Sequence, residues 1–303
     1  MEPFVRVKNV SKTIRGKQII QAINFDLMPG QITGFIGPNG AGKTTTIRIM
    51  TGLMKPTSGE VEIGGISMQQ NFSEAIRPVG VIVENPELYG YLSGYKNLLH
   101  FARMHDKVSK DELARIIEQV GLTDRIHEKV ATYSLGMRQR LGLAQALLHK
   151  PKFLILDEPT NGLDPAGIRE LRLLLRKLAD EEHVAVLVSS HLLAEIELMC
   201  DHIIIIQRGE IIETRDIRAT QQSRYRFEIA SEALEILTSY NYTFKQLENF
   251  TIVDIERQHV PTLIAQLVEQ GIAIYRVEPY HESLEDQFLQ VTGGGMHVPT
   301  HSK

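Results

Sequence analysis

The sequence has a single cysteine, and it has no apolar run long enough to cross a membrane. One cysteine, Cys200, excludes a disulfide framework within the chain, which is typical of proteins from a reducing compartment. Because Cys200 lies in an apolar helical stretch, we expect it to be a small buried thiol. The apolar segment 202–206 is far shorter than the roughly 18 residues that span a bilayer, so we expect a buried strand there. A role at a membrane would therefore need a partner.

Positive charge is also scarce. The 303 residues include 33 lysines and arginines against 37 aspartates and glutamates, which gives a net charge of -4. No global positive field favours nucleic acid, and we expect no nucleic-acid partner. Residues 216–303 are more acidic still, with 12 acidic and 7 basic side chains, so an RNA-binding appendage is disfavoured. The chain is long enough for one sizeable globular domain and a smaller one.

The first two thirds of the chain alternates short apolar strands with helices. Such alternation predicts a largely parallel sheet with helices packed around it. The strands are predicted over 4–10 (as an edge strand), 31–37, 79–83, 153–156 and 184–189, and the helices over 44–53, 109–120 and 168–178.

The pattern changes after about residue 216. Shorter strands and helices follow, which predicts a small α+β accessory domain. They are predicted over 225–229, 249–256 and 272–277 for strands, and over 233–237, 261–269 and 284–291 for helices. We therefore divide the chain into a first domain over 1–216, an accessory domain over 217–292 and a flexible tail over 293–303, which begins with three glycines.

A glycine-rich turn that ends in a lysine follows the strand predicted over 31–37. It fits the phosphate-binding pattern G-x-x-x-x-G-K-[ST] in full and opens a predicted helix, which is the context the pattern requires. Glycines let the backbone wrap so that consecutive N–H groups converge on phosphate oxygens, and the helix dipole adds to the attraction. We expect Lys43 to reach the β- and γ-phosphates of ATP and the Thr44 hydroxyl to bind Mg²⁺. The residues expected to contact the nucleotide here are Gly37, Pro38, Asn39, Gly40, Ala41, Gly42, Lys43, Thr44 and Thr45.

Two carboxylates, Asp157 and Glu158, come directly after the apolar segment 153–156. A buried strand that ends there would present both side chains at the edge of the sheet. We expect Asp157 to join the Mg²⁺ coordination sphere, directly or through water, and Glu158 to position or deprotonate the attacking water. An apolar run ending in Asp-Glu is common by itself. Its combination with the glycine-rich turn is what predicts nucleotide hydrolysis.

Three further segments resemble motifs of the ABC family of ATPases. Residues 133–140 are similar to the ABC signature, usually Leu-Ser-Gly-Gly-Gln followed by Gln-Arg, and match it at Ser134 and Gly136. They depart from it at Tyr133, Leu135 and Met137. Residues 161–164 resemble the D-loop, and Ser-Ser-His over 189–191 resembles the switch histidine. With the two nucleotide motifs, five motifs stand in the family's order.

The resemblance covers roughly residues 4–215 and implies both a fold and a mechanism. The implied fold is an α/β, P-loop ABC ATPase domain with a RecA-like core, an N-terminal antiparallel β subdomain and a helical subdomain. The implied active form is a dimer of two copies, in which Ser134 and Gly136 of one copy contact ATP held by the other. The resemblance also places Asp164 beside the nucleotide and gives His191 a part in hydrolysis.

The resemblance further implies a separate transmembrane permease and a place on the cytoplasmic face of a bacterial cell membrane. The family's permeases insert a short helix into a region that corresponds to residues 86–105, which is rich in apolar and aromatic side chains. Simple core packing would explain most of these side chains equally well. The transported molecule is not implied, because substrate contacts belong to the permease.

Two further positions, outside the signature-like segment, depart from the family pattern. Family members often stack adenine on an aromatic residue at the position of Ile14, so an aliphatic face is expected to hold the base here. Glu84 stands where the family has a glutamine that binds Mg²⁺ and contacts the permease, which makes it a candidate catalytic and metal-binding residue. A glutamate can still bind a metal, but it repels bare phosphate. The alternative is an ordinary surface glutamate.

Glu84 and the Asn-Pro-x-Leu-Tyr that follows it resemble the bacitracin-resistance and lantibiotic-immunity branch of ABC exporters. Residues 283–289 resemble the same branch, in which an accessory domain follows the ATPase. This resemblance implies export of a peptide antibiotic or other drug-like compound. For the accessory domain itself we favour a dimer-stabilising or capping role over a sensory one.

Two other classes of function stay open at this point. A non-transport ABC ATPase would act on ribosomes or nucleic acid, although ribosomal members usually carry two ATPase units and chromosomal members a long coiled coil. Another P-loop class, such as a nucleotide kinase or a GTPase, would lack the signature-like segment and the ordered His191. Dimerisation that depends on ATP, and a membrane protein as the co-purifying partner, would separate these classes.

Overall fold

The computed structural model describes residues 2–83, 86–105, 108–217, 224–230, 233–247 and 250–280. The chain falls into two compact units, divided between Arg215 and Asp216. Among the described residues, no helix combines the length and the apolar character needed to cross a bilayer.

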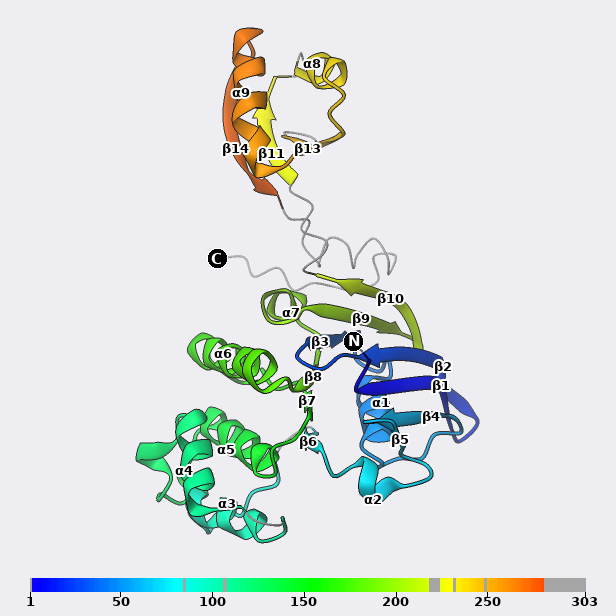
Figure 1. Cartoon of the computed structure of the whole chain (residues 1–303), viewed down its shortest axis with the longest axis vertical. Helices are drawn as coiled ribbons and strands as arrows, with labels where there is room; N and C mark the ends of the chain where they lie inside the picture. The colour runs from blue at the N-terminus through cyan, green and yellow to red at the C-terminus, as the bar shows by residue number, and fades with distance from the viewer. Residues whose placement is uncertain are drawn as a thin grey trace. The chain divides into compact units, whose positions relative to one another are not determined.

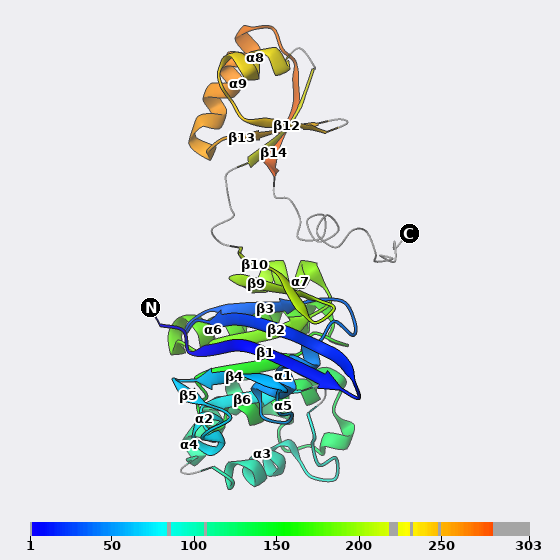
Figure 2. The same cartoon turned by 90° about the vertical axis from the view of Figure 1, so that its right-hand side faces the viewer.

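The first unit begins with a four-stranded antiparallel sheet in the order β2-β1-β4-β5. Its strands are β1 (Val5–Ile14), β2 (Lys17–Leu27), β4 (Ser58–Ile63) and β5 (Ile66–Ser67). Figure 2 shows β1 between β2 and β4, so the prediction of an edge strand over 4–10 is wrong. The reason is β4, which pairs with the second side of β1 and which the sequence pattern did not indicate.

A six-stranded sheet in the order β10-β9-β3-β8-β7-β6 forms the centre of this unit. Its strands are β3 (Ile32–Ile36), β6 (Val79–Ile82), β7 (Phe153–Asp157), β8 (Ala185–Ser190), β9 (His202–Gln207) and β10 (Glu210–Asp216). β3, β6, β7, β8 and β9 pair in parallel, as predicted. Because β3, β7 and β8 are buried at every position, their sequences read as continuous apolar runs rather than alternating ones.

Helices lie on both sides of the parallel sheet. Figure 1 shows α1 (Lys43–Met50) on one side of β6, β7 and β8, and α5 (Leu135–Leu147) and α6 (Pro165–Glu182) on the other. α5 belongs to a helical group with α3 (Gly94–Ala102), α4 (Lys110–Gln119) and the 3₁₀ turns Thr123–Arg125 and Val130–Thr132. The remaining helices of the unit are α2 (Phe72–Ala75) and α7 (Leu193–Met199).

α6 is longer than the helix predicted over 168–178. Asp164 is its N-cap and accepts a hydrogen bond from the Gly167 N–H at 2.8 Å, and Pro165 occupies the first helical position, where it needs no N–H partner. The helix is tied to the sheet by Arg176, which donates to both oxygens of buried Asp201 at 2.8 and 2.9 Å. Asp201 also accepts from the Ile32 N–H at 2.8 Å, at the first residue of β3. This network fixes α6 against the start of the strand that leads into the phosphate-binding turn.

The second unit has the element order of a split β-α-β fold. β11 (Arg224–Ile229), α8 (Ala233–Ser239), β12 (Phe244–Leu247), β13 (Phe250–Asp254), α9 (Val260–Glu269) and β14 (Ile274–Tyr280) follow one another, and 3₁₀ turn Arg257–His259 precedes α9. The sheet order is β12-β13-β11-β14 with antiparallel pairs, which is the ferredoxin-like arrangement. A separate core, including Phe227, Leu237, Val253, Leu263 and Leu267, holds it together. The predicted helix over 284–291 and the tail over 293–303 lie outside the described residues.

Candidate active site

The glycine-rich turn connects β3 to α1 in a conformation that depends on its glycines. Gly40 and Gly42 adopt φ of 79° and 116°, values that favour glycine. At Gly42 an added Cβ would also lie 2.6 Å from Ile20 Cδ1, and at Gly37 it would lie 2.3 Å from the Ile206 carbonyl oxygen. Two strands therefore press against this turn, and only glycine fits between them.

Lys43 is the first residue of α1, and its side chain folds back over the turn. It is 7% exposed, and its ammonium donates to the Gly37 carbonyl at 2.7 Å. The same ammonium lies 3.4 Å from Oε1 of Glu158, at the end of β7. Thr44 and Thr45 follow on the first turn of the helix and are half-buried. A cation, two hydroxyls and backbone N–H groups are thereby gathered at one helix N-terminus, which suits phosphate oxygens.

Asp157 is the last residue of β7 and is 2% exposed. The strand register pairs it with Ser189 of β8, and the Ser189 hydroxyl donates to Asp157 Oδ1 at 2.5 Å. The same hydroxyl oxygen accepts from the Glu158 N–H at 2.9 Å. Sequence reasoning gave Ser189 no role. The signal that could have found it is the neighbouring position of two parallel strands, which becomes visible only once the strand order is known.

Glu158 turns sharply away from the strand that carries it. Its backbone adopts φ of 51°, a left-handed value that non-glycine residues rarely take and that often marks functional sites. Its Oε2 lies 2.7 Å from Nδ1 of His191, which follows β8 and is partly exposed. The Glu158 carboxylate is therefore held between Lys43 on one oxygen and His191 on the other. The structure thus brings Lys43, Asp157, Glu158 and His191 together, as the sequence predicted.

The signature-like residues lie elsewhere. Ser134 is the N-cap of α5, where its hydroxyl accepts from the Met137 N–H at 3.3 Å, and Gly136 lies in the first turn of the same helix. Figure 1 shows α5 across the parallel sheet from α1, so within one chain these residues are separated from the phosphate-binding turn. Asp164 uses its carboxylate to cap α6. A single chain therefore does not assemble all of the predicted nucleotide contacts.

Two departures from the usual signature have structural reasons. Tyr133 is 2% exposed, and its hydroxyl donates to the Arg125 carbonyl at 2.7 Å, so burial raises the pKa of this phenol. The aromatic side chain thereby links the start of α5 to the 3₁₀ turn Thr123–Arg125. Leu135 packs against Gly162, where an added Cβ would lie 2.2 Å from Leu135 Cδ2. This contact joins the start of α5 to the segment that leads into α6.

Of two further predicted positions, Ile14 and Glu84, only Ile14 lies within the described residues. Ile14 ends β1 and is 37% exposed, so it offers an apolar surface. Glu84 lies outside the described residues, just beyond the end of β6 at Ile82. Cys200 is buried, as expected, and burial raises the pKa of its thiol. Among the described residues, no group of three or more His, Cys, Asp or Glu side chains could hold a metal ion without other ligands.

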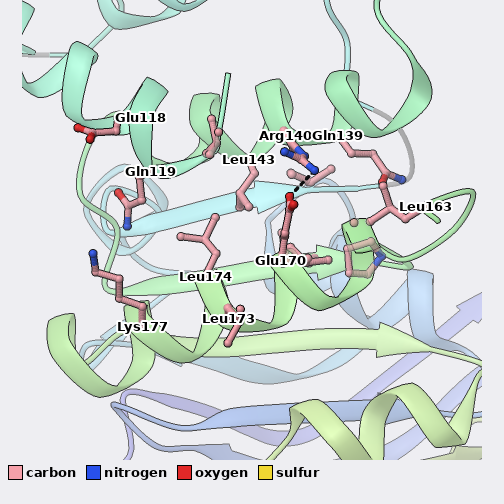
Figure 3. Close-up of a pocket in the computed structure, with 17 residues that line it drawn as sticks. Glu118, Gln119, Gln139, Arg140, Leu143, Leu163, Glu170, Leu173, Leu174 and Lys177 are labelled. Carbon is pink, nitrogen blue, oxygen red and sulfur yellow. Dashed lines mark ion pairs between the residues drawn. The ribbon is translucent and has the colours of Figure 1, made fainter. Parts of the chain in front are cut away.

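A cavity of about 580 Å³ separates α5 from α6. Figure 3 shows Gln139, Arg140 and Leu143 facing Glu170 and Leu174 across it. An ion pair between Arg140 and Glu170 crosses the gap. The lining includes no residue of the phosphate-binding turn, so the cavity is not the phosphate site. The cavity lies between the helical group, to which α5 belongs, and α6 of the core.

The chain is similar to known proteins over nearly its whole length. The family described as ABC transporter matches residues 20–161. An uncharacterized ABC transporter ATP-binding protein of Bacillus subtilis (strain 168), YhcH, is 53% identical over 97% of this chain and 97% of its own length. The bacitracin transport ATP-binding protein BcrA of Bacillus licheniformis is 37% identical, over 97% of this chain and 99% of its own. The lantibiotic transport ATP-binding protein SrtF of Streptococcus pyogenes is 39% identical, over 69% of this chain and 89% of its own.

Solved structures match the first unit. An ATP-binding subunit of an ABC transporter is 30% identical, with a TM-score of 0.65, over 71% of this chain and 91% of that one. A dimeric ATP-binding cassette in a post-hydrolysis state, bound to ADP and Pi, is 26% identical, with a TM-score of 0.64, over 71% of this chain and 99% of that one.

Proposed function

Because this chain belongs to the family of ABC transporter ATP-binding proteins, we propose that it drives a separate membrane permease as an ATP-bound homodimer. Membership of the family implies that the chain binds and hydrolyses ATP. The observation that carries the proposal is the cluster of Lys43, Asp157, Glu158 and His191 at the ends of β7 and β8, beside the glycine-rich turn.

Each part of the turn has a role in holding the triphosphate. The backbone N–H groups of the turn, to which Pro38 contributes none, surround the phosphate oxygens, and the Lys43 ammonium exchanges its present partners for the β- and γ-phosphates. The Thr44 hydroxyl and the Asp157 carboxylate are oxygen donors of the kind that Mg²⁺ prefers, and they would be this chain's ligands to the ion. When bound, Mg²⁺ neutralises phosphate charge. Exposed Ile14 offers adenine an apolar face.

Glu158 acts on the attacking water. A carboxylate is a suitable general base, and the side chains of Glu158 and Asp157 have different partners, so the two acids can serve different atoms. His191 holds the second oxygen of the base, and we assign it a contact with the γ-phosphate in the ATP-bound state. Hydrolysis then cleaves the γ-phosphate from the nucleotide, and this phosphate is the group that the dimer holds.

The second copy supplies the missing contacts. Ser134 and Gly136 start α5 on the far side of the sheet from the phosphate-binding turn, so only another chain brings such a helix N-terminus to the γ-phosphate. We assign Asp164, the N-cap of α6, to the same interface. A γ-phosphate gripped from both copies holds the dimer closed, and its loss on hydrolysis opens the pair.

The permease is contacted through the segment after β6 and through α3. Tyr89 and Tyr91 are exposed there at 39% and 72%, whereas Leu98 of the same region is fully buried, so part of the region is core and part is available to a partner. Glu84 directly precedes this segment in the sequence, and we assign it a role in coupling and in the Mg²⁺ shell. The chain would then lie peripherally on the cytoplasmic face of a bacterial membrane.

The transported compound follows from the relatives. Two of them are named for transport of bacitracin and of a lantibiotic, and the sequence of this chain aligns with BcrA through the accessory domain as well. We therefore assign to the transporter the export of a peptide antibiotic or another drug-like compound. The accessory domain, a compact unit with its own core, is assigned to dimer stabilisation or capping.

Affinity purification of the full chain from detergent-solubilised membranes of its native cell tests the function. The Glu158→Gln variant with Mg-ATP should retain an integral membrane protein, identified by mass spectrometry, and should elute as a dimer. A Lys43→Met variant, handled in parallel, controls for nucleotide-independent binding. Recovery of ribosomal proteins instead, or a monomer in both variants, would overturn the proposal.

A further inference from the structure

We propose that Ser189 is a positioning residue for ATP hydrolysis, which holds both carboxylates of the acidic pair through one hydroxyl. The inference rests on the proposed roles of Asp157 and Glu158. It adds a role for Ser189, which stands two residues before His191 in the switch-histidine segment and is not among the predicted nucleotide contacts.

The contact is built into the sheet. β7 and β8 are parallel neighbours, and their register places Ser189 directly beside Asp157 at the last rung of the ladder. Ser189 is fully buried, so no solvent competes for its hydrogen bonds. Its hydroxyl donates to Asp157 Oδ1 at 2.5 Å and accepts from the Glu158 N–H at 2.9 Å.

A hydroxyl is suited to this place because it donates and accepts at the same time. The donated proton forms a charge-assisted bond with a buried carboxylate, and it occupies only one of the two oxygens of Asp157. The accepted N–H would otherwise be a buried backbone donor without a partner, which proteins rarely tolerate. Neither alanine nor valine can replace both bonds.

The hydrogen bond that the Ser189 hydroxyl accepts from the Glu158 N–H also affects how the proposed base is oriented. Glu158 takes a left-handed backbone conformation, which is unfavourable for a side chain and needs surrounding contacts to maintain it. The bond from Ser189 fixes the N–H of that residue, while Lys43 and His191 fix the two carboxylate oxygens. In an ATP-bound state the phosphates compete for Lys43, so the backbone bond to Ser189 and the contact with His191 are the parts of this support that remain within the chain.

The test compares Ser189→Thr with Ser189→Val in the full chain. These side chains have the same shape and differ in the hydroxyl, so any packing strain is shared. Steady-state ATPase activity and equilibrium binding of Mg-ATP are measured for both. We expect Ser189→Val to lower kcat roughly tenfold to a hundredfold relative to Ser189→Thr, with the Kd for Mg-ATP changed by less than about threefold. Equal kcat values in the two variants would overturn the inference.

A double-mutant cycle excludes a merely structural role. If Ser189 acts through Glu158, then adding Ser189→Val to Glu158→Gln should lower the residual turnover by much less than it does in the wild-type background. Additive losses, which a general loosening of the sheet would cause, would contradict the inference. If Glu158→Gln alone leaves turnover intact, the proposed function fails. If it lowers turnover while Ser189→Val does not, only the role of Ser189 fails.

Discussion

The ammonium of Lys43 lies 3.4 Å from Oε1 of Glu158, so the cation of the phosphate-binding turn is paired with the proposed base. Both side chains are largely buried, at 7% and 19% exposure. We expect triphosphate binding to weaken this pairing, because the phosphates and the carboxylate compete for the same ammonium. Nucleotide entry is thereby linked to release of one oxygen of the base.

Replacing Lys43 by methionine should weaken Mg-ATP binding by roughly tenfold to a hundredfold, the size expected for losing a charge-assisted contact. The apolar stem is kept, so the glycine-rich turn should retain its packing. Equilibrium binding of a fluorescent ATP analogue measures the loss, and a thermal melt without nucleotide reports stability. Lys8→Met, which removes a partly exposed cation paired with Glu62, is the control. Unchanged affinity would refute the role of Lys43.

Glu158→Gln should lower ATP turnover by roughly 10²–10⁴-fold, because glutamine keeps the shape but cannot accept the proton of water. Binding should persist, since the amide still contacts His191. The variant should therefore collect as a dimer in Mg-ATP, measured by size-exclusion chromatography with light scattering. Glu62→Gln, a carboxylate change on β4 far from the strand ends, serves as the matched control. Wild-type turnover in Glu158→Gln would exclude it as the base.

Glu84→Gln should leave the affinity for Mg-ATP within about tenfold, equivalent to about 1.4 kcal/mol. Lys43, Mg²⁺ and the backbone N–H groups outweigh one carboxylate at the rim of the site. Glu84→Ala should instead uncouple transport, because it removes both a metal-side acceptor and the link to the permease. ATPase activity and drug resistance, measured side by side in the assembled transporter, test this. If Glu84→Ala changes neither, Glu84 is an ordinary surface residue.

His149 should make the fold sensitive to acid. Its Nε2 donates to the Val79 carbonyl at 3.0 Å, its buried Nδ1 has no partner among the described residues, and its ring stacks on His105. Burial, and to a lesser extent the neighbouring His105, lowers the pKa of this imidazole. Below about pH 6.5, the ordinary imidazole value, the unfolded chain binds a proton that the folded chain resists, so stability falls as pH falls.

His149→Gln should flatten this dependence, because its amide can donate to the same carbonyl without titrating. Urea unfolding at pH 5.0 and pH 7.5 gives the free energy of unfolding for each protein. His127→Gln, at an exposed position, should keep the dependence of the parent. Equal pH dependence in the parent and His149→Gln would show that another group is responsible.

Local motifs predicted the family and its chemistry better than they predicted which strands are neighbours in the sheets. The ABC family and its fold, read from five ordered motifs, are confirmed, because spacing along the chain fixes which side chains a turn or strand end presents. The pairing of β4 with β1 and of Ser189 with Asp157 could not be read in the same way. Both depend on which strands are neighbours, and strands far apart in sequence carry no local mark of their partner.

The burial of Cys200 has a practical consequence for spectroscopy. As the only thiol of the chain, packed against Gly34 and Ile196 with a raised pKa, it should react slowly with maleimide reagents in the native fold. Cysteines introduced at exposed positions, such as Leu173 on α6 and Tyr275 on β14, should then take spin labels selectively. Pulsed dipolar spectra of such a pair would report the distance between the two units with and without nucleotide.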